Sequence, residues 1–518
     1  MKKLSHLFLA IIFLDVTTGV CQITTFHGAE SPGPFIFWDG HMKGNSIART
    51  KDGKYVVGGV IDESGLHGRP YVLKSSVTGT NAWQRIYLGE HGTYSGKVLS
   101  LREYGAGGIV ATGHIMNGGW YHTLFLKIGP NGNTLVTKGF RFYADDFGTC
   151  IQVVRNASGT PSGTVLTGIS SPGGGFVHVT DANGEPLATT LIANSITRWV
   201  VQTPDGFLVL GGNFENSELH LFKFTSDLTL LWSRAYRPIE SGSSIYGTSI
   251  TQVGSVIYVT GTISGSALLM QLNTDGTFNW ARTYGSNSIS VSLATKKEVN
   301  GVGGLYLTGK VRSTEQDRAY ILNTDLNGNR RWSKVYHLEI VASEGREIIT
   351  TADSLVVTGA NGDNMFLIRT DPQGLSGGLC EYSVAMQATT QAITETAFNV
   401  TFRSPHYEEL KSTFLDKFNV MQAFCNWDTT IPPHIGDLDP SVVVYPTVVS
   451  SAINIELKSP SDAEGSVALF DVNKKLQVQA IPPGTSNVTL HVSHLAPGLY
   501  YLLISTNGKE TTAKFIKQ

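Results

Sequence analysis

A strand that ends in glycine recurs seven times along the middle of the chain, and this repeat limits the fold more than any other feature. The repeats end at Gly59, Gly113, Gly168, Gly212, Gly261, Gly309 and Gly359. Their spacing of 44 to 55 residues, filled by strand and turn patterns, is the length of a four-stranded blade. The sequence therefore predicts an all-β protein in which residues 22–378 form a seven-bladed β-propeller.

The order of strands within a repeat is clearest between residues 246 and 285. Three strands are expected near Tyr246–Val253, Val256–Thr262 and Ala267–Asn273, and a turn at Asp275-Gly276 then leads into a fourth strand with Trp280. A tryptophan stands at the same place in three other repeats: Trp83, Trp232 and Trp332. Because such a ring buries a large area, we expect these tryptophans to wedge between neighbouring blades. They resemble the docking tryptophan of quinoprotein-type propellers. That likeness is confined to the blade, so no cofactor is expected.

The last repeat lacks an outer strand, and the start of the mature chain can supply one. No strand of this type follows Asp371 before Cys380, whereas Gln22–Gly28 reads like an outer strand placed ahead of the first repeat. We expect this segment to pair with the seventh blade and close the ring, because closure removes an exposed sheet edge.

The N-terminus has the pattern of a secretory signal. Met1-Lys2-Lys3 is cationic, and the apolar run Leu7–Leu14 is too short to span a bilayer. We expect cleavage after Cys21, which makes residues 1–21 a signal peptide. A lipidated Cys21 is the alternative, and Val20 disfavours it because a lipobox needs a small residue there. No later run approaches the length of a membrane span.

The composition of the chain and its cysteines limit which functions and which disulfides it can have. The formal net charge is -2 and only 15% of residues are charged, which gives no basic footprint for nucleic acid. Residues 379–437 read as a small strand-containing spacer that ends in a hinge at Pro432-Pro433. Cys380 and Cys425 bracket this spacer and are able to form a disulfide in an oxidising compartment. Cys150 lies in an apolar strand pattern and is expected to be a buried free thiol.

The last 80 residues carry four motifs in a fixed order: Val443-Val444-Tyr445-Pro446, Val467–Lys475 around Asp471, Leu495–Ile504 with Gly498 and Tyr500, and a terminal Thr511–Gln518 with Lys514, Phe515 and Lys517. Together they resemble the C-terminal sorting domain of the type IX secretion system of Bacteroidetes-type bacteria. The resemblance implies a compact antiparallel β-sandwich over residues 438–518. It also implies partners in the type IX machinery, with removal of the domain by a sortase-like peptidase and possible attachment to surface lipopolysaccharide. The protein is then secreted or held at the outer cell surface.

Connection lengths distinguish the two faces of the predicted ring. The turns between first and second, and between third and fourth, strands are tight, whereas the other connections are longer and more varied. Because function gathers on variable loops of a rigid scaffold, binding residues are expected on the longer loops. The candidates are Trp38, Asp39, His41, His67, Arg69, Trp120, Tyr121, His122, Tyr143, Asp145 and Asp146. Aromatic rings beside carboxylates and arginines suit a sugar or peptide surface; solvated loop residues or rim packing are the competing interpretation.

Signals for catalysis are weak. Asp145-Asp146 is the one adjacent carboxylate pair in a candidate loop, and sequence neighbours do not show that two carboxyls face each other across a glycosidic bond. The phrases beginning at Asp181 and Asp325 resemble the start of a calcium loop, but they recur at the third turn of a repeat and favour Asx turns. No catalytic residue and no metal site are therefore assigned. The sequence favours a protein that binds an extracellular glycan or protein. The alternatives are a polysaccharide hydrolase or lyase, and a structural or adhesive surface component.

Overall fold

The chain forms two compact units, residues 1–424 and 425–518, in the computed structural model. The structure describes residues 23–26, 41–62, 68–75, 81–88, 95–117, 119–143, 145–172, 174–213, 217–285, 289–296, 304–312, 317–336, 342–362, 364–376, 381–404, 408–410, 419–422, 442–445, 448–457, 465–470, 475–495, 498–506 and 509–517. The predicted signal peptide, Cys380, Cys425 and the hinge at Pro432-Pro433 lie outside these residues.

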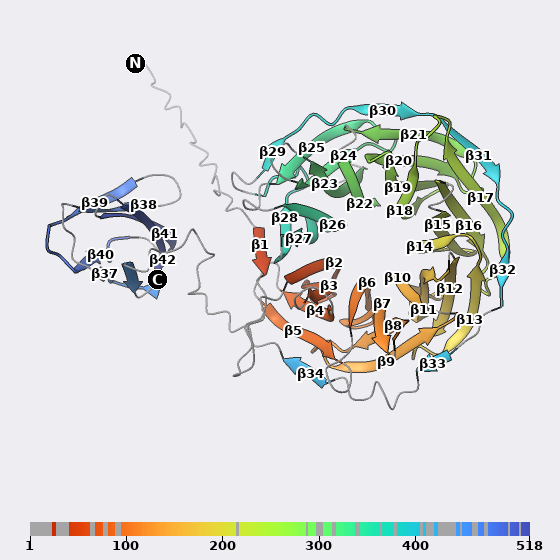
Figure 1. Ribbon diagram of the computed structural model, residues 1–518, viewed down its shortest axis with the longest axis horizontal. Helices are drawn as coiled ribbons and strands as arrows, with labels where there is room; N and C mark the ends of the chain where they lie inside the picture. Colours follow the sequence, from red (N-terminus) through yellow and green to blue (C-terminus); the bar gives the residue numbers. More distant parts are fainter. Residues whose placement is uncertain are drawn as a thin grey trace, which may run out of the picture. The chain divides into compact units, whose positions relative to one another are not determined.

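Seven antiparallel sheets are arranged in a ring (Figure 1), so the predicted seven-bladed propeller is confirmed. The innermost strands of blades 1 to 7 are β2 (His41–Arg49), β6 (Gly96–Tyr104), β10 (Asp146–Arg155), β14 (Ile196–Thr203), β18 (Ile245–Val253), β22 (Ile289–Lys296) and β26 (Ser343–Thr350). The second strands are β3 (Tyr55–Asp62), β7 (Gly108–Asn117), β11 (Pro161–Ser170), β15 (Gly206–Asn213), β19 (Val256–Ile263), β23 (Leu305–Arg312) and β27 (Leu355–Asn361).

The outer strands complete each blade. The third strands are β4 (Arg69–Ser75), β8 (Trp120–Ile128), β12 (Gly174–Asp181), β16 (Glu218–Phe224), β20 (Ser266–Asn273), β24 (Asp317–Thr324) and β28 (Asn364–Thr370). The fourth strands of blades 1 to 6 are β5 (Asn81–Leu88), β9 (Thr134–Arg141), β13 (Pro186–Ile192), β17 (Leu230–Pro238), β21 (Phe278–Tyr284) and β25 (Arg330–Tyr336). Apolar clusters join each blade to the next; one of them packs Leu210 and Leu221 of blade 4 with Val259, Leu268 and Met270 of blade 5.

The repeating glycine has a steric cause. In every blade the innermost strand carries a bulge of one residue, for example between Gly44 and Ser46. The glycine of the second strand lies opposite the bulge. A methyl group on Gly59 would approach the Lys43 carbonyl oxygen to 1.8 Å, and one on Gly261 would approach that of Tyr246 to 1.8 Å. In blade 4 the residue at this register is Gly211, one position before the glycine that the sequence pattern marks.

The predicted wedging of the tryptophans between blades is present. Gly328, in the turn before the fourth strand of blade 6, faces Trp280 of blade 5 so closely that a methyl group on it would lie 2.7 Å from the ring. The Tyr284 hydroxyl donates to the Gly328 carbonyl oxygen at 2.7 Å. The same arrangement recurs with three other pairs of tryptophan and glycine: Trp83 with Gly132, Trp232 with Gly276 and Trp332 with Gly374. In each fourth strand that carries a tryptophan, the ring therefore packs against a turn of the next blade.

The N-terminal segment closes the ring as expected. Strand β1 (Ile23–Phe26) pairs antiparallel with β28 of blade 7, with Ile23 opposite Ile368. It forms the fourth strand of that blade, so the first and last repeats share one sheet.

The segment predicted as a spacer contains strands, as expected, and its described residues between 381 and 422 lie along the outside of the ring as a belt (Figure 1). Its strands pair antiparallel with the fourth strands of blades 6 to 1 in reverse order: β29 (Glu381–Ser383), β30 (Ala388–Gln391), β31 (Ile393–Ala397), β32 (Phe402–Arg403), β33 (Glu408–Leu410) and β34 (Asn419–Gln422). Blades 1 to 6 thus have five strands. The physical reason is that each fourth strand leaves a free row of backbone groups, and the belt pairs with it.

Residues 442–517 form two sheets that share one core. One sheet has β35 (Val442–Tyr445), β37 (Ala452–Leu457) and β40 (Asn487–His491); the other has β36 (Val448–Val449), β42 (Lys509–Lys517), β41 (Gly498–Thr506), β38 (Gly465–Phe470) and β39 (Lys475–Ile481). Tyr500 and Phe515 are cross-strand partners whose rings stack at 5.4 Å in this core. Lys517 is buried and Lys514 lies in β42, while Pro446 and Asp471 lie outside the described residues.

Candidate ligand-binding sites

The two faces of the ring differ in their connections. We call the face with the second-to-third and blade-to-blade connections the loop face, and the opposite one the turn face. Of the residues predicted to bind on the loop face, Trp38, Asp39 and His67 lie outside the described residues, and only the backbone of His41 is described. Arg69 is the first residue of β4 in blade 1. The other six come together on blade 2 and its junction with blade 3.

Two aspartates shape the loop between β9 and β10. The Asp146 carboxylate accepts hydrogen bonds from the backbone N–H groups of Phe142 at 2.6 Å and Tyr143 at 3.2 Å. Burial raises the pKa of Asp146, while the bonds from these N–H groups and the nearby His122 oppose that rise. The Asp145 carboxylate accepts from the N–H of Tyr121 at 2.9 Å and so ties this loop to β8. Both carboxylates therefore position the backbone.

Two half-exposed aromatic rings lie near each other here: Trp120 begins β8, and Tyr143 belongs to the loop. Trp120 is 47% exposed and Tyr143 is 50% exposed. Thr123 of β8 pairs with Phe140 of β9. Trp120 lies three residues before Thr123 and Tyr143 three residues after Phe140, so both lie at the same end of this strand pair. The Arg141 guanidinium lies over the Trp120 ring, 5.5 Å from its centre. Cation–π contacts of this kind hold a ring in one orientation.

The belt supplies the other half of this surface. The Arg403 guanidinium lies 5.7 Å from the centre of the Tyr143 ring and donates to the Pro172 carbonyl oxygen at 3.2 Å. Phe402, next to it in β32, is 45% exposed. Trp120, Tyr143 and Phe402 are the aromatic residues with such high exposure among those whose side chains the structure describes. We call Trp120 and Tyr143, with Arg141 and Arg403, the aromatic rim.

Tyr121 and His122 support the aromatic rim and are not part of its surface. Tyr121 packs against Phe147 at 4.8 Å and edge-on against His114 at 5.2 Å between ring centres. His122 is only 3% exposed. Burial lowers the pKa of His114 to about 3, so this imidazole is neutral at ordinary pH. Next to the aromatic rim, the side chains of Tyr121, His114 and Phe147 thus form a packed aromatic cluster.

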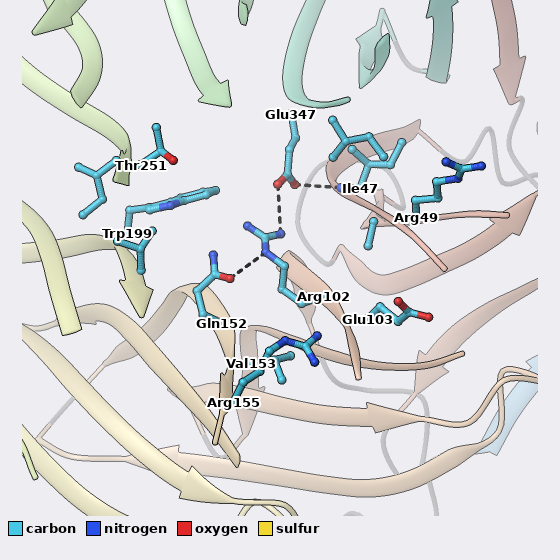
Figure 2. Close-up of a pocket in the computed structure, with 14 residues that line it drawn as sticks. Ile47, Arg49, Arg102, Glu103, Gln152, Val153, Arg155, Trp199, Thr251 and Glu347 are labelled. Carbon is cyan, nitrogen blue, oxygen red and sulfur yellow. Dashed lines mark hydrogen bonds and ion pairs between the residues drawn. The ribbon is translucent and has the colours of Figure 1, made fainter. Parts of the chain in front are cut away.

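A second candidate site was not predicted from the sequence. A cavity of about 400 Å³ lies between the innermost strands, towards the turn face; we call this central space the channel, and Figure 2 shows the lining of the cavity. The innermost strands of blades 1 to 5 and of blade 7 contribute to it, and its lining includes none of the predicted binding residues whose side chains the structure describes. The sequence does carry a signal for this site. In four blades a polar or aromatic residue follows the bulge of the innermost strand by one to three positions: Arg102, Gln152, Trp199 and Glu347.

These four residues form a connected network across the channel (Figure 2). Arg102 Nη1 lies 3.1 Å from Glu347 Oε1, and Arg102 Nε donates to Gln152 Oε1 at 3.3 Å. The Arg102 guanidinium also lies over the Trp199 ring, 5.3 Å from its centre. The second oxygen of Glu347 accepts from the N–H of Ile47 at 2.9 Å. Side chains from blades 2, 3, 4 and 7 and a backbone group of blade 1 thus meet here.

A buried chain of hydrogen bonds in blade 4 has the order of a catalytic triad but no access to solvent. His220 Nδ1 lies 2.8 Å from Ser195 Oγ, and His220 Nε2 lies 3.1 Å from Glu218 Oε2. Ser195 and His220 are 0% exposed. Phe398 of the belt stacks on His220 at 3.9 Å between ring centres. A nucleophile needs a substrate within reach, so this chain is a structural link between blade and belt.

Metal-binding clusters and membrane-spanning helices are absent from the described part of the chain. Its residues contain no cluster of histidine, cysteine or carboxylate side chains able to hold a metal ion, and no helix long and apolar enough to cross a membrane. The expected Asx turns are confirmed, because Asp181 Oδ1 accepts from the N–H groups of Asn183 and Glu185 at 2.7 and 2.8 Å, and Asp325 repeats the pattern. Cys150 is a buried free thiol, as expected.

Residues 443–518 match the family model described as "Secretion system C-terminal sorting domain". The tail therefore is a type IX sorting domain, which marks proteins that are secreted or attached to the outer cell surface. No curated protein matches the sequence significantly.

Several solved structures resemble the chain at low identity. Sqt1 from Chaetomium thermophilum is 10% identical with a TM-score of 0.39, over 64% of this chain and 96% of that one. A structure titled "NanB plus Optactamide" is 10% identical with a TM-score of 0.37, over 67% and 71%. The extracellular domain of BT4673 from B. thetaiotaomicron is 9% identical with a TM-score of 0.17, over 94% and 87%. At such TM-scores the likeness says nothing of the sites.

Proposed function

Because the chain carries a type IX secretion sorting domain, we propose that its seven-bladed ring acts outside the cell by binding a glycan at the aromatic rim. The observation that supports this most is the pair of half-exposed rings, Trp120 and Tyr143, each held by an arginine on a rigid sheet. The sortase-like peptidase implied by the tail would be a partner during export.

Stacking explains why a sugar fits this surface. The apolar face of a pyranose covers an aromatic ring, while its hydroxyls need polar partners at the edge. Asp145 uses one carboxylate oxygen for the Tyr121 N–H, and its other oxygen accepts no hydrogen bond from a described residue. The rim is an open surface, which suits an oligosaccharide of several units.

Hydrolysis or lysis of polysaccharide is less well supported by the same residues. Asp146 is 0% exposed and its carboxylate holds two backbone N–H groups of its own loop. Its neighbour Asp145 ties that loop to β8. Two carboxyls that fix backbone in this way do not face each other across an open site, as glycoside cleavage requires.

The test is a screen of the purified mature chain against oligosaccharides, followed by calorimetry on the tightest binder. Covering the exposed half of an aromatic ring contributes about 1.4 kcal/mol, so Trp120→Ala and Tyr143→Ala should each weaken binding about tenfold. Leu231→Ala is the matched control, because Leu231 is 50% exposed on β17 of blade 4 and away from the rim.

Three outcomes would contradict the proposal. The first is the absence of any oligosaccharide that binds. The second is binding that both aromatic variants leave unchanged. The third is substrate turnover that Asp145→Ala abolishes, which would make the protein an enzyme.

A further inference from the structure

We propose that the channel cavity at the turn face is a second binding site, for a small molecule that carries one carboxylate. The carboxylate lies against Arg102 and the body of the molecule lies against Trp199. This site is separate from the aromatic rim: it opens towards the other face of the ring and shares no residue with the rim.

Arg102 is held in place before any ligand arrives. Its Nη1 contacts Glu347 at 3.1 Å and donates to the Leu101 carbonyl oxygen at 2.6 Å, its Nε donates to Gln152, and its flat face lies on Trp199. Its Nη2 makes no hydrogen bond to a described residue. Nη2 can therefore donate to one oxygen of a ligand carboxylate, and because the guanidinium is already fixed, little side-chain entropy is lost when the ligand binds.

The charges that line the cavity favour a monoanion. Three arginines, Arg49, Arg102 and Arg155, stand against two glutamates, Glu103 and Glu347, which leaves one positive charge in excess. Arg49 and Arg155 are exposed, and Figure 2 shows both beside the cavity. Arg49 makes no hydrogen bond to a described residue, and Arg155 donates to the Gly159 carbonyl oxygen at 3.0 Å. These exposed cations attract an anion towards the channel.

The remaining wall is apolar and sets the size of the ligand. Trp199, Val201, Ile250 and Ile349 also line the cavity, which therefore offers an apolar surface within reach of Arg102. A volume of about 400 Å³ is in the usual range for small-molecule sites. A single sugar acid or an aromatic acid meets these conditions. A neutral sugar brings no negative charge to Arg102, so its hydrogen bonds to the guanidinium are weaker, and a dianion exceeds the available positive charge.

The experiment is calorimetric titration of the mature chain with galacturonate and benzoate, with galactose and inorganic phosphate as comparisons. At least one acid should bind with a dissociation constant of about 1 mM or tighter, and affinity should fall with added salt. Galactose and phosphate should bind at least tenfold more weakly.

Two variants change the affinity in opposite directions. Arg155→Gln removes an exposed cation and should weaken acid binding about threefold to tenfold. Glu347→Gln removes a negative charge beside Arg102, while the bonds to the Leu101 carbonyl oxygen and to Gln152 still hold the guanidinium, so acid binding should tighten severalfold. Arg330→Gln, an exposed arginine at the start of β25, is the matched control and should change nothing.

Binding of neither acid above the level of galactose would overturn the proposal. So would phosphate binding as tight as acid binding, or acid binding that is unchanged in both Arg155→Gln and Glu347→Gln. Trp120→Ala should leave acid binding intact, so a failure of the rim proposal and a failure of this one are distinguishable.

Discussion

The contact between Trp280 and Gly328 gives the sharpest test of how the blades hold together. Gly328 has a φ of 75°, in the left-handed region, where a side chain costs about 1–2 kcal/mol. In Gly328→Ala the new methyl group would lie 2.7 and 2.8 Å from two ring carbons of Trp280, and overpacking of this kind costs about 1–3 kcal/mol more. The free energy of unfolding should therefore fall by about 2–5 kcal/mol.

Gly242→Ala is a matched control for this substitution. Gly242 has a φ of 82° and nothing within 4 Å of an added methyl group, so it carries the backbone cost alone. Unfolding in urea, followed by circular dichroism, compares the two variants. Adding Trp280→Ala should reduce the extra cost of Gly328→Ala, because the ring that obstructs the methyl group is gone. Equal destabilisation by Gly328→Ala and Gly242→Ala would refute the claim that the contact between Trp280 and Gly328 stabilises the packing of blade 5 against blade 6.

Three further predictions concern the belt, the stability of the fold at acid pH, and export. A mature chain that ends at Gly378 should unfold at lower urea concentration than one that ends at Phe424, because the shorter chain loses the belt pairing and the Arg234–Glu395 ion pair; equal midpoints would show that the belt is dispensable. Burial lowers the pKa values of His114 and His178 to about 3, so the unfolded chain takes up protons below about pH 6.5 while the folded chain does not, and lowering the pH from 7 to 5 should cost about 2 kcal/mol per histidine. His178→Gln should flatten that slope, and an unchanged slope would contradict it. A chain that ends at Asp437 should stay in the periplasm, and normal surface delivery on cell fractionation would argue against the assigned role of the tail.

The ring was predictable because the glycine that recurs in each blade is a local sequence signal, and the backbone of the blade requires it. The bulge in each innermost strand presses a carbonyl oxygen against the facing residue, so Gly59 and Gly261 tolerate no side chain, and the glycine repeats with the blade. The tail was predictable because its motifs lie together at one end of the chain.

The belt could not be foreseen from sequence patterns. Its strands are two to five residues long, too short for an alternation of apolar residues to identify them. Each pairs with an edge far away in the sequence, as Tyr236 of β17 does with Glu395 of β31. The sequence shows a Thr-rich stretch there but not what that stretch pairs with.

The two candidate sites differ in the same way. Trp120, Tyr143 and Asp145 come from one hairpin and its loop, so their proximity followed from the expected strands; Arg403 reached them only through the belt. The channel network depends on residues as distant as Ile47 and Glu347, which closure of the ring brings within 2.9 Å. Aligning the repeats on the bulge would have placed Arg102, Gln152, Trp199 and Glu347 near one level of the channel.

The most direct test of the central claim is a crystal structure of the mature chain with the oligosaccharide that binds tightest in the screen. The account predicts pyranose rings over Trp120 and Tyr143 on the loop face, with Asp145 or a rim arginine within hydrogen-bonding distance of a hydroxyl. An oligosaccharide bound at any other surface, with the aromatic rim uncovered, would contradict it.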